Sequence, residues 1–464
     1  MTAGDTLPAS PSGAAAHLRR VLGLRDLVVV AGASMGPAFS VATTLAAMLT
    51  ATGRWTWLAV LIVTALMAMI ASGYKRLGER VRDAGSSYAW IRTAFGPVAG
   101  AYGAWILLVA NVFAILATAL PAGAYTLDLL APALVPNGGA VALAACGWIA
   151  ATALLLWYGL RPTTMLTLAL LVAEVLVLLA AASASAGAPR PEALAFSGTP
   201  LAWGALGPAI VLGVWLLDGW EACASTSEEA HGAASIPGAG ALVGLILTSL
   251  LVLGATWAFA RIGSAQGFAE HEDDALAYVG GLLGGWWPRV LIATVLVSLA
   301  ASLQATLVYL SRSVYAMGRD GVLPRAFGAL DRRAQPAWSI LSITVLALAF
   351  TLATGLVPKA KDVFDVVLKG TAWYTGALFV VTAAAAVRIF GPEGTARWSG
   401  AVLPGSAAAV LAAVLVQALK TDDPLTRGFI AASAIIGLPL ALWRGRSVRR
   451  AAPSGGGPTT GSRF

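Results

Sequence analysis

Long apolar stretches, separated by short polar segments, run along almost the whole chain. A helix that crosses a membrane needs roughly 20 consecutive apolar residues, and the strands of a membrane β-barrel would be shorter and alternate in polarity. The pattern therefore predicts an all-α integral membrane protein with twelve transmembrane helices. Their expected ranges are 26–50, 55–74, 97–124, 140–158, 163–183, 205–227, 236–260, 288–311, 338–357, 362–388, 400–419 and 427–443.

The composition agrees with apolar surroundings. Hydrophobic residues make up 58% of the 464 positions and charged residues 11%, with a mean hydropathy of +0.80. A soluble domain carries about 25% charged residues, and a disordered chain has low hydrophobicity. Two cysteines are too few for a disulfide scaffold. The first 16 residues lack the basic start and apolar core of a cleaved signal peptide.

Positive charge is divided unevenly between the two sides of the expected membrane. With twelve spans, both termini lie on the same side, and that side carries 21 of the 30 lysines and arginines. Because these residues concentrate in cytoplasmic loops, we expect both termini in the cytoplasm and the protein in the cytoplasmic membrane. The same distribution explains the net charge of +8 without a nucleic-acid partner.

The spans fall into two five-helix blocks of similar length, which are typical of an inverted repeat. We expect these blocks at 26–183 and 205–388, followed by two accessory helices at 400–443. A cytoplasmic tail at 1–25 precedes them. The Arg-, Gly- and Ser-rich tail at 444–464 is expected to be disordered.

The first helix of each block contains helix-breaking residues near its centre, and such paired breaks are the best sequence pointer to a transporter's binding site. Proline suits the first position of a helix, so a second half-helix is expected to begin at Pro37. Its positive end would face the middle of the membrane and could receive an anionic group; a plain proline kink is the alternative. The predicted substrate-binding residues of the first break are Ala33, Ser34, Met35, Gly36 and Pro37.

The second break, Asp218-Gly219-Trp220-Glu221, places two acids inside an apolar helix, where charges are costly and usually functional. All four residues are predicted to bind substrate. We expect Asp218 to cap a half-helix that starts at Gly219, and Glu221 to help hold a ligand amine. The Trp220 ring offers a face for a cation, with plain packing as the alternative.

Other polar residues repeat at helical spacing. Ser298, Ser302 and Thr306 share a face of span 288–311, and Ser302 and Thr306 are predicted to lie near the substrate. A second polar stripe consists of Asn111 and Thr118 in span 97–124 and of Tyr125 directly after it. Packing between helices is the alternative for such residues.

Three further acidic features follow from the pattern. Glu174 is the one acid in span 163–183 and is predicted to couple transport to protons, with a structural acid as the alternative. Glu228 and Glu229 are predicted to form a gate with the basic stretches at 75–92 and 312–333, with two solvated acids as the alternative. The acidic loop at 263–287 is either a solvated loop or part of a lid that concentrates cations.

Three stretches give the whole chain a family resemblance. They are Gly32 to Phe39; Gly85-Ser86-Ser87-Tyr88-Ala89-Trp90 with Phe95-Gly96-Pro97; and Asp218 to Glu221 with Glu228-Glu229, Ser311-Arg312 and Arg319 to Pro324. With these motifs the chain resembles the amino acid–polyamine–organocation (APC) permeases. The resemblance implies a LeuT-type fold, with a 5+5 inverted repeat and two additional C-terminal helices. It also implies secondary transport by alternating access.

The first-helix motif departs from the family pattern. Members of this family usually have Gly-Ser-Gly where this chain has Met35-Gly36-Pro37. Proline has no N–H, so one donor for a substrate carboxylate is missing, and amines remain candidate substrates. Some branches of the family place a lysine at the position of Glu174, where a coupling sodium would otherwise lie.

Signals for an enzyme are absent from the sequence. The three histidines have no metal-binding spacing, the two cysteines form no Cys-x-x-Cys, and there is no phosphate-binding loop. We expect no cofactor and no metal. The expected function is secondary transport of amino acids or related small amines, proton-coupled or by exchange, with the lipid bilayer as surroundings. The open alternatives are a polyamine or organocation carrier and a transport-inactive membrane sensor.

Overall fold

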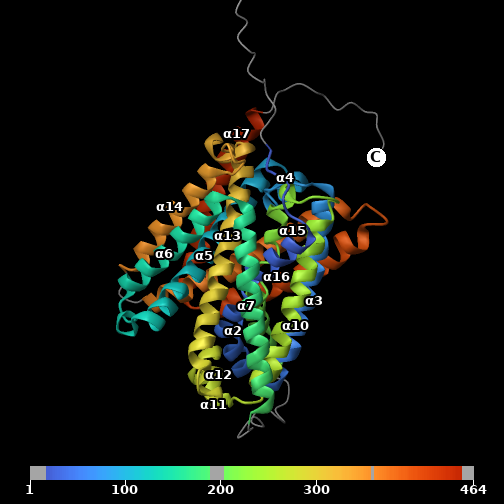
Figure 1. Cartoon of the computed structure of the whole chain (residues 1–464). Coiled ribbons are helices and arrows are strands. Elements are labelled where there is room, and N and C mark those ends of the chain that lie inside the picture. Colours follow the sequence, from blue (N-terminus) through green and yellow to red (C-terminus); the bar gives the residue numbers. More distant parts are fainter. Residues whose placement is uncertain (1–16, 189–202, 357–359, 452–464) are drawn as a thin grey trace, which may run out of the picture.

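The computed structural model of the chain describes residues 17–188, 203–356 and 360–451 (Figure 1). Within these ranges the secondary structure is helical without any β-strand, and one parallel bridge joins Leu22 to Ala230. Ten helical stretches in them are long and apolar enough to cross a membrane. These observations confirm the prediction of an all-helical, multi-pass membrane protein.

The first membrane helix is in two pieces. The pieces are α1 (Leu24–Met35) and α2 (Pro37–Thr52). The chain continues with α3 (Thr56–Arg80), α4 (Ser87–Phe95), α5 (Pro97–Leu130), α6 (Gly138–Tyr158) and α7 (Leu160–Gly187).

A second divided helix consists of α8 (Trp203–Leu216) and α9 (Ala222–Ser225). The chain continues with α10 (Ile236–Ala260), the short α11 (Ala265–Glu270) and α12 (Ala275–Leu283), then α13 (Trp287–Arg319), α14 (Ala337–Thr354) and α15 (Ala360–Phe390). The last two helices are α16 (Leu403–Thr421) and α17 (Pro424–Ala451).

The ten stretches differ from the twelve predicted spans in two places. Residues 24–80 form one helical stretch of 57 residues, in which Gly36 and a short turn at Gly53–Trp55 separate α1, α2 and α3. The other place is α8, which has 14 residues and is too short for a span by itself.

One of the two predictions for the segments outside the spans needs correction. The tail was expected to be disordered from residue 444, but α17 continues to Ala451; residues 452–464 lie outside the described part. The acidic loop at 263–287 contains α11 and α12, and Asp274 caps α12 by accepting the Ala277 N–H (2.9 Å). Glu270, Glu272 and Asp273 are exposed, so the solvated-loop interpretation stays open beside the lid.

The centre of the bundle is formed by α5 and α13. In the most apolar 18-residue segment of α13, 72% is buried. The corresponding share in α7 is 22%, so most of the surface of α7 faces outward. Helix α13 packs against α1, α2, α5, α6 and α7. The polar stripe of α13 therefore faces other helices and not lipid.

The bundle has two distinct ends. In Figure 1, α11 and α12 lie at the lower end, and α4 and the end of α17 lie at the upper end. We call these the α12 end and the α4 end. The polar network that follows α9 and α13 lies with α4, because Glu228 accepts a hydrogen bond from the Ala84 N–H and Asp320 accepts one from the Tyr88 hydroxyl.

Candidate functional site

The first helix breaks at a single residue. Helix α1 ends at Met35, Gly36 has a left-handed φ of 54°, and Pro37 begins α2. Glycine adopts this conformation at little cost, and proline fits the first position of a helix. The predicted break is present, but it is narrower than the expected 33–37, because Ala33 to Met35 remain helical.

The start of α2 is capped by two side chains from other helices. The Ala38 N–H donates to Glu174 Oε2 of α7 (3.2 Å), and the Phe39 N–H donates to Ser298 Oγ of α13 (3.2 Å). The next N–H, of Ser40, bonds to the Gly36 carbonyl (2.8 Å). These backbone N–H groups are therefore not free to bind the predicted anionic ligand. The Glu174 carboxylate already accepts a hydrogen bond at the start of α2.

The second break lies directly against the first. Residues 217–221 form turns, Gly219 has a φ of 116°, and its N–H donates to Glu221 Oε2 (3.0 Å). A Cβ atom added at Gly219 would lie 2.7 Å from the backbone carbonyl carbon of Ser34. Because only glycine allows this approach, the two breaks are in contact, and Ser302 Oγ donates to the Ser34 carbonyl beside them (3.0 Å).

Asp218 does not cap a half-helix, so that prediction is wrong. Helix α9 begins at Ala222, three residues later than expected, and no side chain caps it. Instead, the Asp218 and Glu221 side chains both line a small cavity between the breaks. The Oδ1 atom of Asp218 has no hydrogen-bond partner within the described residues.

A cavity of about 40 Å³ lies between the breaks. Seven of the predicted site residues line it: Ser34, Met35, Asp218, Gly219, Glu221, Ser302 and Thr306. Asn111 and Thr118 of the α5 stripe also line it. Ala33, Gly36 and Pro37 are not among its lining residues, because they form the backbone of the break behind it.

The aromatic residues that line the cavity are Phe39, Trp215 and Tyr309, and Trp220 is not among them. Trp220 is fully buried, stacked on Phe379 (ring centroids 5.2 Å apart) and edge-on to Tyr74 (5.0 Å). It therefore packs between helices away from the cavity. Trp215 lines the cavity and its indole N–H has no partner among the described residues. Trp215 and Thr375 were not predicted as site residues, because both lie in regular helix and no local sequence signal marks them.

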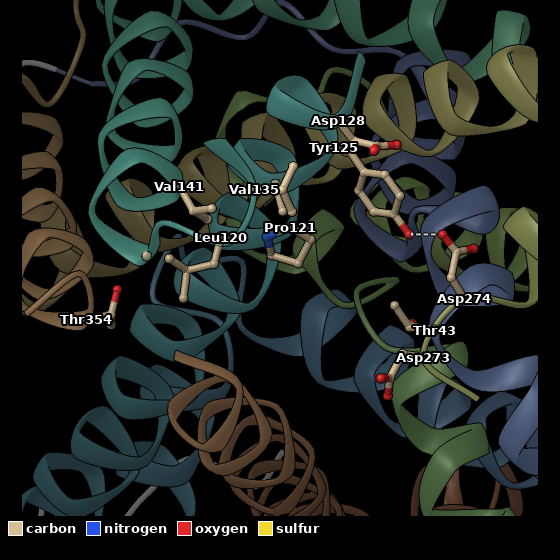
Figure 2. A pocket seen from close by; sticks show the side chains of 12 residues that line it. Thr43, Leu120, Pro121, Tyr125, Asp128, Val135, Val141, Asp273, Asp274 and Thr354 are labelled. Carbon is tan, nitrogen blue, oxygen red and sulfur yellow. Dashed lines mark hydrogen bonds between the residues drawn. The ribbon is translucent and has the colours of Figure 1, made fainter. Parts of the chain in front are cut away.

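A larger cavity of about 430 Å³ lies at the α12 end, where Asp273 and Asp274 directly before α12 line it. Figure 2 shows its lining side chains. We call it the outer vestibule. It is lined mainly by apolar residues of α5 and α6, together with Asp128, Asp273 and Asp274. The Tyr125 hydroxyl donates to Asp274 Oδ2 (2.6 Å), as Figure 2 shows. Burial raises the pKa of Asp274, an effect that this hydrogen bond partly offsets.

The outer vestibule lies close to the central cavity. Thr43 lines the outer vestibule, one helical turn along α2 from Phe39, which lines the central cavity. Along α5, Leu120 and Pro121 of the vestibule follow Thr118 of the central cavity. The acidic loop contributes Asp273 and Asp274 to the vestibule wall, the position that the lid interpretation requires.

The α4 end is closed by ion pairs. Arg312 Nε donates to Glu229 Oε2 (2.9 Å) and Arg312 Nη2 to Glu229 Oε1 (3.1 Å), and the two side chains are 0% and 1% exposed. Arg319 pairs with both Glu228 and Asp83 (2.8 Å each). The predicted pairing of Glu228 and Glu229 with the 312–333 stretch is therefore present.

The 75–92 stretch and the N-terminal segment complete this closure. The Arg82 guanidinium donates to the carbonyls of Ser227 (2.6 Å) and Ala230. The Val21 and Leu22 N–H groups both donate to the Glu229 carbonyl (2.8 and 3.0 Å). Burial raises the pKa of Asp83, an effect that nearby Arg319 opposes.

No site for a metal is evident in the described ranges, where no three His, Cys, Asp or Glu side chains cluster suitably. The polar groups of the central cavity could instead hold a small polar ligand through carboxylates, hydroxyls and one indole N–H.

Comparison with known proteins identifies the family. The family model described as amino acid permease matches residues 22–438. The chain is 26% identical to the uncharacterized amino acid permease YecA of Bacillus subtilis over 333 residues, 70% of this chain and 74% of that protein. It is 22% identical to the branched-chain amino acid permease BcaP of Lactococcus lactis over 314 residues, 62% of this chain and 66% of that protein.

A further relative is an uncharacterized transporter of Mycobacterium tuberculosis. It is 28% identical over 353 residues, 74% of this chain and 77% of the relative. Since the family match extends over most of a chain that is built of membrane-length helices, this protein belongs to the amino acid permease family of membrane transporters.

Proposed function

We propose that the protein is a secondary active transporter that moves amino acids or related small amines across the cytoplasmic membrane by alternating access. The observation that carries the proposal is the central cavity between two touching helix breaks, with the outer vestibule at one end and buried ion pairs at the other. A carrier needs such a site, and a barrier that can change sides.

We further propose twelve crossings in a LeuT-type 5+5 arrangement with two added helices. The supporting observation is that α1 and α2 together are long enough for one crossing before α3, and that α8 and α9 together can supply another. Both termini would then be cytoplasmic, since the α4 end carries the excess of arginine. The structure would correspond to a carrier closed toward the cytoplasm, with Glu228 and Glu229 in the inner gate.

Glu174 is the proposed coupling group. It is fully buried in α7 and caps α2, the half-helix that follows the substrate-site break. A carboxylate interacts favourably with the positive end of a helix, and a neutral carboxyl group interacts more weakly. Proton binding at Glu174 would therefore loosen α2 from α7 and link a pH gradient to the movement of the break. A carrier that only exchanges substrates would not need this step.

Uptake into proteoliposomes tests the proposal. Labelled amino acids and small amines would be offered with and without a pH gradient, with protein-free liposomes as the control. We expect at least one compound to enter only the protein-containing vesicles, and to accumulate when a gradient is imposed. Binding of a ligand without any flux would support the transport-inactive sensor and refute the carrier.

A further inference from the structure

An apolar groove runs between α7 and α10, in the half of each helix that lies toward the α12 end. Its volume is about 280 Å³. On α7, Leu178, Ala182 and Ala186 line it at steps of four along one face. On α10, Ala255 and Ala258 are among the lining residues. Because alanine side chains are short, they leave open space between the two helices, which we call the α7–α10 groove.

The α7–α10 groove opens to the outside of the bundle. Leu179, Leu250 and Trp257 line it, and each of these side chains is about half exposed. Since the helices are of membrane length, the surroundings at this depth are the hydrocarbon of the bilayer. No described lining residue of the groove also lines the central cavity or the outer vestibule. The groove is therefore separate from the proposed substrate path.

A hydrocarbon chain suits the groove better than water does. The one hydroxyl among its described lining residues, that of Ser183, already donates to the Leu179 carbonyl (2.8 Å). A bound water needs roughly two to four polar partners, which this surface does not offer. An empty space would forfeit dispersion contacts of the side chains around it. The acyl chain of a lipid supplies those contacts.

Arg261 marks the polar end of the groove. It directly follows α10, and its guanidinium carbon lies 4.5 Å from the centroid of the Trp257 ring. Its Nε atom is buried and has no hydrogen-bond partner among the described residues. No ion pair in the described part of the chain includes Arg261. A buried N–H of a charged group without an acceptor is costly, so Arg261 indicates an anionic ligand group.

We propose that the α7–α10 groove and Arg261 bind an anionic phospholipid, with an acyl chain in the groove and the phosphate on the guanidinium. The Nε and one Nη of arginine present two parallel N–H donors, which match two oxygens of a phosphodiester. Tryptophan is enriched at the level of lipid headgroups, so Trp257 lies at the depth that this arrangement needs. A lipid with a single negative charge, such as phosphatidylglycerol, neutralises the arginine.

A second copy of the chain is the rival occupant of the groove. In a two-fold symmetric contact, this face of α7 and α10 would meet itself. Helix α10 contains no acid, and the one acid of α7, Glu174, is fully buried and caps α2. Such a contact would bring two arginines together without a carboxylate. A phospholipid instead carries hydrocarbon and a negative charge in one molecule.

Native mass spectrometry of the purified full-length protein tests the proposal. The protein is delipidated in detergent and offered three probes: phosphatidylglycerol, a diacylglycerol with the same chains, and glycerol 3-phosphate. We expect one phosphatidylglycerol to bind about tenfold or more tightly than the diacylglycerol, which cannot accept charge-assisted hydrogen bonds. Glycerol 3-phosphate should not stay bound, because it has no chain for the groove.

Variants locate the lipid. Arg261→Gln should lower the affinity for phosphatidylglycerol about tenfold or more and leave that for the diacylglycerol unchanged. Arg289→Gln, an exposed arginine near the start of α13, is the matched control and should behave as the wild type. Ala182→Leu fills part of the groove and should weaken the binding of both lipids. Its control is Ala150→Leu, at an exposed position of α6.

Three results overturn the inference. They are equal affinity of the wild type for phosphatidylglycerol and the diacylglycerol, equal effects of Arg261→Gln and Arg289→Gln, and a protein dimer in place of the lipid-bound monomer. The last would assign the groove to a second copy. The wild-type comparison decides even if Ala182→Leu fails to fold. Failure of lipid binding would leave the carrier proposal intact, and absence of flux would leave the lipid site intact.

Discussion

Arg312 holds Glu229 by two hydrogen bonds in a pair that is completely removed from solvent. The Gln335 side-chain carbonyl accepts a third bond from the same guanidinium (3.0 Å), and the Glu229 backbone carbonyl receives two N–H groups of the N-terminal segment. One contact thus connects α13, the end of the α9 segment and the segment before α1. Separating these elements at the α4 end requires that this pair be broken.

Arg312→Gln is expected to leave Glu229 buried without a cation. Breaking a buried pair from one side costs about 3–5 kcal/mol, so the free energy of unfolding should fall and the α4 end should open. Opening can be followed with the buried Cys223 thiol, in a Cys146→Ser background. Maleimide labelling of Cys223 should become faster. Arg80→Gln, which breaks a half-exposed pair with Glu393, is the control; equal effects of the two variants would contradict a gate.

Gly219→Ala is expected to separate the two helix breaks. The added methyl group would lie 2.7 Å from the Ser34 carbonyl carbon, and the φ of 116° is strained for alanine. We expect a loss of about 1–3 kcal/mol in stability and a larger loss of transport. Gly254→Ala in α10 meets no atom within 4 Å and should leave both unchanged. Wild-type uptake by the Gly219 variant would show that the contact is dispensable.

Substitutions of the two tryptophans near the second break should affect different properties, ligand binding in one case and stability in the other. Trp215→Phe removes the unpaired indole N–H from the cavity and should weaken ligand binding about tenfold with little change in melting temperature. Trp220→Ala removes packing against Phe379 and Tyr74 and should cost about 3–5 kcal/mol of stability. Trp338→Phe, a half-exposed site on α14, is the control. Calorimetry and thermal unfolding together distinguish these outcomes.

Glu174→Gln should uncouple transport from the pH gradient. The glutamine carbonyl can still accept the Ala38 N–H, so the cap on α2 is kept while the titration is lost. We expect gradient-driven accumulation to disappear and exchange at equal concentrations to continue. Glu174→Leu removes the cap as well and should reduce stability by about 1 kcal/mol. Wild-type accumulation by the glutamine variant would place the coupling proton elsewhere.

The raised pKa of the Asp274 carboxyl group predicts how the stability of the protein changes with pH. Its pKa in the folded protein is raised by burial above the ordinary value of 3.8. The folded state then holds this proton more tightly than the unfolded state, so the contribution to stability is largest below pH 3.8. It declines as the pH rises through the raised value.

Asp274→Asn keeps one oxygen atom, which can accept the Ala277 N–H, and its amide nitrogen can donate to the Tyr125 hydroxyl, but the side chain cannot titrate. Melting temperatures measured between about pH 4 and pH 7 should therefore fall less steeply for this variant than for the wild type. Glu272→Gln, an exposed change in the same loop, is the control. A variant slope equal to that of the wild type would contradict the prediction.

Local signals were sufficient where the chain's own chemistry dictates the backbone. Gly36 followed by Pro37 ends one helix and begins another in any surroundings, so the first break could be predicted to within a residue or two. The hydrophobic pattern likewise gives the helices, because an apolar segment of this length satisfies its backbone hydrogen bonds internally. Helix ends were less certain, and α13 and α17 continue well past their apolar segments.

The sequence by itself thus determined the membrane helices, their two breaks, and the pairing of acids and arginines at the α4 end. Tertiary structure alone decided which partner each polar group meets. Glu174 caps a helix 136 residues away, and Trp220 turns into the packing while Trp215 reaches the cavity. Such outcomes depend on how the helices are rotated and packed against each other. That packing is determined jointly by residues that are far apart in the chain.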